Sequence, residues 1–273
     1  MANGMPPRYV LGYSDTEQDR LIRQATLLAP ITERLFREAG IGRGYHVLDV
    51  GSGLGDVAMI AARLVGASGE VHGIERNASF VSRARERVAT IGFRNVTFVQ
   101  ADANALAIEG PFDAIVGRLV LNHNPDPVAM VRSVTQLLIP GGVLALQEIA
   151  VSPALAVAAG QPLWSRVITR IQDMIHESDM KPDAGLALNR IFQEAGLPDP
   201  HIHLDVPFTQ DASIAQLEVD LLRSLAGHHG ASLADLGDLD TLVGHIHAEA
   251  LSARSAIGFM GIVSAWSRKT SCL

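Results

Sequence analysis

The chain has 273 residues, of which 48% are hydrophobic and 19% charged, so it is long enough and apolar enough to bury a substantial core. Its net charge of −7 disfavours a nucleic-acid partner, which usually requires a basic face. No apolar run reaches the ~18 residues of a membrane span, and the N-terminus lacks an apolar signal region, so we expect a cytoplasmic protein without a membrane partner. The single cysteine, Cys272, excludes an intramolecular disulfide.

A helical segment is predicted at the N-terminal end of the chain. Ser14 and Glu17 have the spacing of a capping box, and apolar residues follow on one helical face. Pro30 is expected to interrupt this helix or to begin a second one that ends at Gly40. We predict that residues 1–40 form a helical cover.

The most informative stretch runs from His46 to Asp56 and reads HVLDVGSGLGD. Its apolar run meets three glycines at alternate positions, and a helical pattern follows at once, which indicates a strand, a tight loop and a helix. Such a turn lets a ligand approach backbone N–H groups at the start of a helix. A dinucleotide fingerprint would require glycine at the place of Asp56, and a carboxylate such as Asp49 beside the turn would repel a diphosphate.

Acidic residues follow two further predicted strands. The strand at 70–75 ends in Glu75, which lies 20 places beyond Gly55, and the strand at 96–100 is followed by Asp102. The carboxyl ends of parallel strands meet at the edge of the sheet where such folds bind ligands. Glu75 is therefore predicted to accept hydrogen bonds from the hydroxyls of a ribose.

These features resemble class I S-adenosylmethionine (SAM)-dependent methyltransferases, in particular small-molecule enzymes of the type 11 and type 25 kind. The sequence LDVGSGLG at 48–55 matches their motif I loop, the strand and loop at 112–127 resemble motif IV, and a Pro-Gly-Gly turn follows at 140–142 in family order. The resemblance covers residues 46–149 and thins beyond them. It implies SAM as the cofactor and a small-molecule acceptor.

The resemblance also implies roles for individual residues. Asp102 resembles the residue that accepts from the adenine amino group, and the N–H of Ala103 would reach a ring nitrogen. His123, after the fourth strand, and Glu148, near the end of the fifth, are the candidate catalytic bases. The predicted cofactor-binding residues are Tyr9, Gln24, Asp49, Gly51, Ser52, Gly53, Gly55, Glu75, Arg76, Asp102, Ala103, Arg118 and Leu119.

The remaining segments are predicted to alternate between insertions and the core. Residues 41–149 are the SAM-binding core, 150–182 and 210–255 are helical insertions that form a lid, 183–209 hold a core helix and strand, and 256–273 hold the last core strand and the tail. Trp164 lies on an apolar helical stripe that is typical of a core and also of a surface in contact with the acceptor. His201 and His203 alternate with apolar residues on one strand, which a polar sheet face explains, so no metal site is predicted.

The predicted fold is α/β, with a Rossmann-like, seven-stranded, mostly parallel sheet, helices on both faces and a helical lid. The predicted function is SAM-dependent methyl transfer to a small organic acceptor, with secondary metabolism as a candidate setting. Two alternatives stay open: an NAD(P)-dependent oxidoreductase on a similar sheet, and a SAM-binding protein without transfer activity. The sequence leaves open the identity of the acceptor, the choice among O-, N-, S- and C-methylation, and a homodimer.

Overall fold

The computed structural model describes residues 11–104 and 108–270, so Tyr9 and Cys272 lie outside the described residues. The chain divides into two compact units. We call residues 25–150, 183–205 and 262–273 the sheet unit, and residues 1–24, 151–182 and 206–261 the helical unit.

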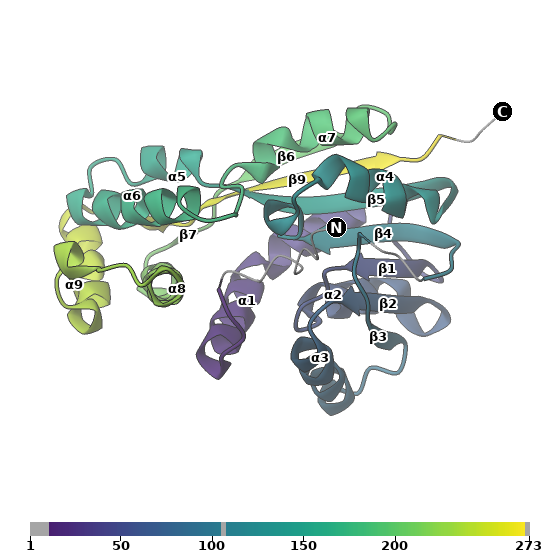
Figure 1. The fold of residues 1–273 in the computed structure, drawn as a ribbon, viewed down its shortest axis with the longest axis horizontal. Coiled ribbons are helices and arrows are strands. Elements are labelled where there is room, and N and C mark those ends of the chain that lie inside the picture. The colour runs from purple at the N-terminus through teal and green to yellow at the C-terminus, as the bar shows by residue number, and fades with distance from the viewer. Residues whose placement is uncertain (1–10, 105–107, 271–273) are drawn as a thin grey trace, which may run out of the picture. The chain divides into compact units, whose positions relative to one another are not determined.

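The sheet unit is built on a seven-stranded sheet with the order β3-β2-β1-β4-β5-β9-β6 (Figure 1). The five strands β1 to β5 pair with one another in parallel, whereas β6 pairs with β9 in antiparallel register. The predicted α/β fold with a seven-stranded, mostly parallel sheet is thereby confirmed. The strands of this sheet are β1 (His46–Val50), β2 (Glu70–Glu75), β3 (Val96–Gln100), β4 (Phe112–Arg118), β5 (Leu138–Ala150), β6 (His201–Asp205) and β9 (Gly261–Arg268).

Helices cover both faces of this sheet, because successive strand residues point to opposite sides. Val47 of β1 packs in the core beneath α2 and α3, whereas Leu48 and Val50 pack in the core beneath α4 and α7. Each buried aliphatic side chain of this kind contributes about 1.5–3 kcal/mol. The helices are α2 (Asp56–Val65), α3 (Ala78–Ile91), α4 (Pro127–Gln136) and α7 (Leu188–Glu194), with the short 3-10 helices η1 (Gly66–Ser68), η2 (Leu121–His123) and η3 (Ala184–Ala187).

The helical unit packs mainly helix against helix. Glu249 caps one of them, because its carboxylate accepts from the backbone N–H groups of Leu163 at 2.8 Å and Trp164 at 3.0 Å. Along the described part of the chain, every helix is too short or too polar to cross a lipid bilayer. The elements are α5 (Ser152–Val157), α6 (Pro162–His176), β7 (Phe208–Thr209), α8 (Ser213–His229), η4 (Ala234–Leu236), α9 (Leu239–Ser252) and β8 (Ile257–Gly258), and β7 pairs with β8.

The helix before the first strand is continuous, contrary to the expected interruption at Pro30. α1 (Asp15–Glu38) contains this proline in its interior. A proline removes one helical hydrogen bond, but Leu28, Leu35 and Phe36 of the same helix are completely or almost completely buried. Packing of this apolar face outweighs the local cost, since most helical stability in proteins comes from tertiary contacts.

The last part of the chain also differs from the single strand predicted from residue 256 onward. β8 ends at Gly258 and belongs to the two-stranded sheet with β7, whereas β9 begins at Gly261 and joins the main sheet. The N–H of Phe259, between them, donates to the carbonyl oxygen of Pro207 at 2.8 Å. Hydropathy alone does not reveal this break, because the residues on both sides of it are buried.

Candidate cofactor site

Four strands of the sheet unit end at one edge, because β1, β2, β3 and β4 run parallel. The glycine loop follows β1, Glu75 is the last residue of β2, Asp102 comes after β3, and Leu119 comes directly after β4. The structure therefore gathers at one edge four sequence features that lie up to about 70 residues apart. Open α/β sheets bind their ligands at such an edge.

The glycine loop is fixed to β2 and adopts a conformation that favours glycine. The φ angles of Gly51, Gly53 and Gly55 are +67°, +52° and +85°. The N–H of Ser52 donates to the carbonyl oxygen of Ile74 at 2.9 Å, and the N–H of Gly55 donates to that of Ser52 at 2.8 Å. α2 begins directly after the loop, so its unpaired N–H groups and the positive end of its dipole lie at this edge.

The three glycines differ in the space around them. A Cβ atom added to Gly51 would lie 2.7 Å from Cγ2 of Val120, and one added to Gly55 would lie 2.7 Å from Cζ of Phe98. A Cβ atom on Gly53 would meet only a backbone oxygen, at 4.0 Å. Gly51 and Gly55 therefore serve close packing within the protein, and Gly53 is the glycine that leaves room for a ligand.

Glu75 connects the glycine loop to the start of α3. One carboxylate oxygen accepts from the N–H of Gly53 at 3.2 Å, and the other accepts from the N–H of Asn77 at 2.9 Å. Arg76, the next residue, is partly exposed, and its carbonyl oxygen accepts from the side chain of Gln100 at 3.1 Å. The predicted ribose ligand is thus held beside the loop by backbone donors.

Asp102 belongs to a hydrogen-bonded turn that reaches the loop after β4. Its carboxylate accepts from the backbone and side-chain nitrogens of Asn104 at 2.8 and 3.1 Å. The side-chain oxygen of Asn104 accepts in turn from Nδ2 of Asn124 at 2.9 Å. Ala103, the second predicted adenine contact, is half-buried in the same turn.

Asp49 is a buried acid at the centre of the sheet unit. Burial raises the pKa of its carboxyl to about 8, although the nearby Arg118 guanidinium and a hydrogen bond from the backbone N–H of Ala58 oppose the shift. Across residues 11–104 and 108–270, the buried hydroxyl of Ser52 has no hydrogen-bond partner. A buried carboxyl group beside a ligand-binding turn is suited to a cationic ligand group.

A buried polar chain begins at Arg118 and was missed by sequence reasoning. Arg118 donates to the hydroxyl of Thr32 at 2.9 Å, and that hydroxyl donates to the side-chain oxygen of Gln147 at 2.6 Å. The amide nitrogen of Gln147 then donates to the hydroxyl of Ser264 at 2.8 Å. The signal in the sequence was a glutamine in an otherwise apolar strand.

The acidic residue at the sixth place of the glycine motif has a partner of its own. Arg87 of α3 forms a bidentate pair with Asp56, with distances of 2.7 and 2.9 Å, and also donates to the carbonyl oxygen of Leu54 at 2.6 Å. The side chain of Asp56 thus ties α2 to α3. This arrangement places a carboxylate where a dinucleotide-binding loop has a glycine.

The loop after β4 has an unusual backbone that Glu148 supports. Leu119 has a φ of +58°, which is uncommon for a residue with a side chain and often marks a functional loop. The buried Glu148 carboxylate accepts from the N–H groups of Val120 at 2.8 Å, Leu121 at 2.6 Å and Asn122 at 3.3 Å. These bonds shape η2, in which His123 is half-buried. The carboxylate is engaged by three backbone donors, which is the arrangement of a loop support, and its role as a base stays a prediction.

Two predicted site residues belong to the helical unit. Gln24 is mostly buried, and its side-chain oxygen accepts from Arg20 at 2.8 Å. Trp164 is completely buried together with Ile168, Ile171 and Ile175, so the stripe that contains it forms the core of this unit. Its position is that of a packing residue. Tyr9, the other predicted cover residue, lies outside the described residues.

Residues 41–196, more than half of the chain, match the family model described as a methyltransferase domain. The chain belongs to the methyltransferase domain family. The ubiquinone/menaquinone biosynthesis C-methyltransferase of Edwardsiella ictaluri is 33% identical over 145 residues, which cover 52% of this chain and 58% of the relative. The arsenite methyltransferase of Aquipseudomonas alcaligenes is 37% identical over 114 residues, which cover 39% of this chain and 33% of the relative. The chain thus spans between a third and about three fifths of these relatives.

The fold of this methyltransferase domain is also found in solved structures. A SAM-dependent methyltransferase from Aquifex aeolicus has a TM-score of 0.51 and 20% sequence identity, and the likeness covers 68% of this chain and 90% of that one. Family membership implies SAM as the cofactor, as the sequence resemblance predicted. The edge fits this molecule in three respects: Gly53 leaves room at the loop, Glu75 lies beside it, and the Asp49 carboxyl is suited to a cationic group.

Because the glycines have different surroundings, we expect substitutions of Gly53 and Gly55 to affect SAM affinity and protein stability to different extents. Gly53→Val should weaken SAM binding at least about tenfold, which is 1.4 kcal/mol, because the side chain enters open space in the binding loop, and its loss of stability comes from the strain of the positive φ alone. Gly55→Ala should lower stability by about 1–3 kcal/mol in addition to such strain, because its Cβ meets Phe98. Calorimetric SAM titration and thermal unfolding of both variants check this. Equal losses of stability in the two variants would contradict it.

Proposed function

We propose that the protein transfers a methyl group from SAM to a small organic acceptor. The observation that carries the proposal is the convergence of the glycine loop, Glu75, Asp102 and the η2 loop at one edge of the sheet unit. SAM supplies a methyl group that its sulfonium already activates. The protein then has to align the acceptor with that group, and alignment alone supplies up to about 7–11 kcal/mol of barrier lowering.

The residues at the edge divide the work of holding the cofactor. Glu75 accepts from the ribose hydroxyls, Asp102 accepts from the adenine amino group, and the N–H of Ala103 donates to a ring nitrogen. Asp49 and the 51–55 loop hold the amino-acid part, where a cationic group of the ligand would favour the ionised form of the buried Asp49 carboxyl and pair with it. Arg76, Arg118 and Leu119 border these groups.

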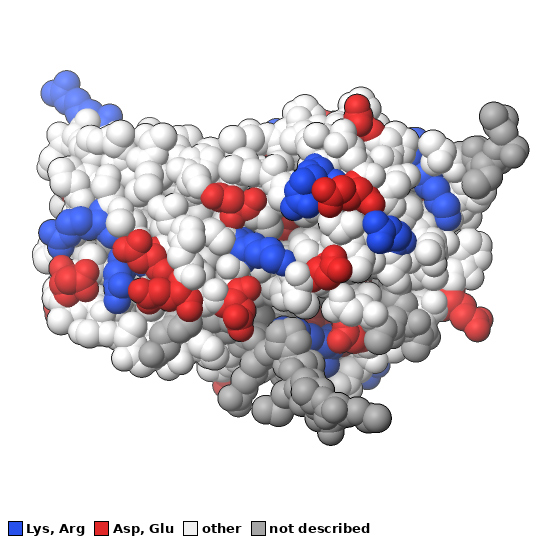
Figure 2. Space-filling model, turned by 45° about the horizontal axis from the view of Figure 1, so that its top comes forward, with Lys and Arg blue, Asp and Glu red and all other residues white. Residues whose placement is uncertain are grey.

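A small acceptor is favoured by the relatives and by the surface. Both curated relatives carry names of enzymes that methylate small molecules. Figure 2 shows basic and acidic side chains intermixed on the face it draws, in keeping with the net charge of −7. A nucleic-acid substrate would instead favour a basic stripe. That the helical unit covers the acceptor stays a prediction.

Calorimetry with SAM, its demethylated product and NAD tests the proposed cofactor site. We expect micromolar binding of SAM, which corresponds to about −8 kcal/mol, and binding of the product as well. Glu75→Ala and Asp102→Ala should each weaken SAM binding by about 1.5–3 kcal/mol, because each removes a charged acceptor. Glu86→Ala, which removes an exposed acid on α3, is the matched control and should bind like the parent. Heat with NAD and none with SAM would favour the oxidoreductase alternative.

Transfer itself is tested by incubating the protein with methyl-labelled SAM and fractions of small molecules from a cell extract. We expect label in one low-molecular-weight product, whose structure then identifies the methylated atom. SAM binding without any labelled product would support the alternative of a SAM-binding protein without transfer activity. The parent and Glu75→Ala are compared in parallel, because the variant should reduce labelling at subsaturating SAM.

We propose that His123 acts as a base or orients the acceptor. It lies in η2, which follows β4, and an imidazole can accept and donate a proton near neutral pH. His123→Ala and His123→Asn should lower turnover about 10²–10⁴-fold with SAM affinity unchanged. Asn124→Ala, in the same loop, is the control: it should cost about 1 kcal/mol for each lost hydrogen bond and leave turnover within tenfold of the parent. A loss of less than about tenfold in both His123 variants would exclude the base role.

A further inference from the structure

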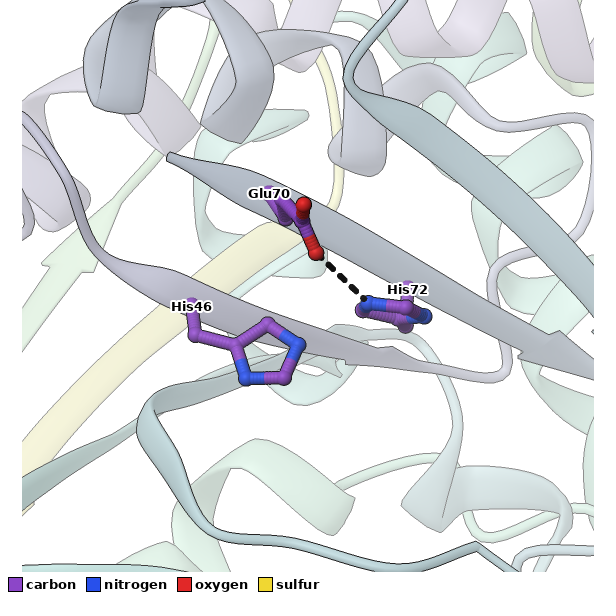
Figure 3. A group of neighbouring side chains, drawn as sticks. All are labelled: His46, Glu70 and His72. Atoms are coloured by element: carbon purple, nitrogen blue, oxygen red, sulfur yellow. Dashed lines mark ion pairs between the residues drawn. The ribbon is translucent and has the colours of Figure 1, made fainter. Parts of the chain in front are cut away.

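Two histidines and a glutamate meet at the opposite edge of the sheet unit, where the parallel strands begin (Figure 3). His46 is the first residue of β1, and Glu70 and His72 lie in β2. His46 is in register with Glu70, and Glu70 and His72 share one face of β2 because they are two residues apart. One ligand atom of each residue lies within 4.8 Å of the other two.

In each imidazole ring, Nδ1 contacts a residue outside the group of three, so Nε2 is the nitrogen that remains available to a shared ion. Nδ1 of His46 lies 3.2 Å from the carbonyl oxygen of Pro111, which can only accept, so the proton of a neutral ring is on Nδ1 and Nε2 holds the lone pair. That Nε2 atom is buried and has no hydrogen-bond partner within the described ranges. Nδ1 of His72 lies 3.0 Å from the hydroxyl of Thr97, and its Nε2 lies 3.6 Å from the Glu70 carboxylate. Metal-binding histidines typically have this arrangement, in which an outer acceptor fixes the ring and the inner nitrogen faces the ion.

The two imidazoles are held firmly, and the carboxylate has room to adjust. The backbone N–H of His46 donates to Asp113 at 2.8 Å, and its ring packs against Phe112 and His72 with centroid distances of 4.6 and 4.7 Å. The Glu70 side chain is 70% exposed and is free to rotate. Ligand atoms around tetrahedral zinc lie about 3.4 Å apart, so the widest separation has to close by ~1.4 Å.

From this geometry we propose that His46, Glu70 and His72 bind one divalent transition-metal ion of the zinc class. Two imidazole nitrogens and one carboxylate oxygen are ligands that zinc prefers, and water completes a four-coordinate shell. The ion would fasten β1 to β2 at the edge opposite the glycine loop. An ion that binds the folded chain and not the unfolded chain stabilises the fold by mass action. The spacing of these residues in the sequence does not indicate a metal site, because His46 lies 24 positions before Glu70 and only strand pairing brings the two together.

Zinc chloride titrated calorimetrically into the tag-free, chelator-treated chain of 273 residues tests the proposal. We expect one equivalent of zinc to bind at micromolar strength or tighter and to raise the melting temperature. His72→Gln should weaken binding by at least ~100-fold, since even residues that only orient a metal ligand cost 10–100-fold when mutated. Glu70→Gln, at an exposed position that tolerates substitution, should weaken binding about tenfold or more and abolish most of the thermal shift. Absorption of the cobalt-substituted protein should show the bands of a four-coordinate site.

The double variant His201→Gln/His203→Gln is the matched control. It also removes two histidines from one strand of the sheet unit, one of them 3.4 Å from the carboxylate of Glu38. We expect it to retain parental zinc binding. Absence of zinc binding by the parent would overturn the proposal, and so would unchanged zinc affinity in both Glu70→Gln and His72→Gln. SAM affinity should stay at the parental value in every zinc-site variant, which separates this proposal from the proposed cofactor site.

Discussion

Replacing Glu148 with alanine should destabilise the protein by about 3–5 kcal/mol and loosen the loop that carries His123. The carboxylate is completely buried and accepts from the N–H groups of Val120, Leu121 and Asn122. Without it, three donors in a buried region lose their partner, and each unsatisfied donor costs about 1–3 kcal/mol. Because Val120 also packs against Gly51, SAM affinity should fall together with stability.

Denaturant unfolding and SAM titration of the same samples measure both effects. Glu148→Gln retains one accepting oxygen and should lose about half as much stability, which keeps the prediction testable if the alanine variant does not fold. Glu249→Ala is the control, since that carboxylate likewise accepts from two backbone N–H groups, but at the start of α6 in the helical unit. It should lower stability and leave SAM affinity unchanged. A Glu148→Ala protein as stable as the parent would show that the loop does not depend on this carboxylate.

The second large effect concerns a buried acid in the helical unit. Glu218 of α8 is 1% exposed, and burial raises the pKa of its carboxyl to about 8, although the nearby charge of Arg20 opposes the shift. Arg20 is already engaged in a bidentate pair with Glu17, at 2.7 and 2.8 Å. In the described portion of the protein, neither oxygen of Glu218 has a hydrogen-bond partner. Glu218 is therefore protonated in the folded state at neutral pH.

The raised pKa makes stability fall as the pH rises. From pH 4.5, the ordinary pKa of the group, to about pH 8, the unfolded chain releases the proton whereas the folded chain retains it. The neutral Glu218 carboxyl therefore contributes its full stabilisation below pH 4.5. This contribution, up to about 5 kcal/mol in the free energy of unfolding, is lost as the pH rises to about 8, and the loss levels off above that pH. Glu218→Gln stays neutral, so we expect it to match the parent near pH 4.5 and to exceed its stability by about 3–5 kcal/mol at pH 9.

Urea unfolding of the parent and Glu218→Gln across pH 4.5–9 tests this expectation. Asp240→Asn is the control because it removes an equal charge from an acid whose side chain is 90% exposed. Its stability should follow that of the parent at every pH. If the free energies of unfolding of the parent and Glu218→Gln differed by the same amount at every pH, the raised pKa of Glu218 would be contradicted.

The convergence of strand ends at which we propose the cofactor site could be predicted from the sequence because its signals are local. The glycine loop, Glu75 and Asp102 each stand at the end of a recognisable strand, and parallel pairing brings such ends together. The bonds that support the edge could not be predicted in the same way. Glu148 is a candidate base from the sequence alone and Gln147 is a polar residue in an apolar strand, whereas the partners of both lie on other segments of the chain.

Two further differences have the same origin in tertiary packing. The proline inside α1 is tolerated because the apolar face of that helix is buried, which a local rule cannot weigh. The alternating pattern at 201–206 predicts a strand with one apolar face. In the structure, however, Ile202 and Leu204 are 41% and 51% exposed, because β6 is an edge strand. A residue pattern identifies the face, whereas burial depends on which elements cover it.

The position of β9 between β5 and β6 constrains the order in which a growing polypeptide acquires its native pairing. β6 is synthesised more than 50 residues before β9, the strand with which it pairs. During translation, β5 and β6 each emerge with an edge that awaits β9, and the exposed Ile202 and Leu204 make the β6 edge a site for off-pathway association. A ribosome-bound chain that ends before residue 261 therefore presents unpaired edges of β5 and β6, whereas the emergence of β9 completes the sheet.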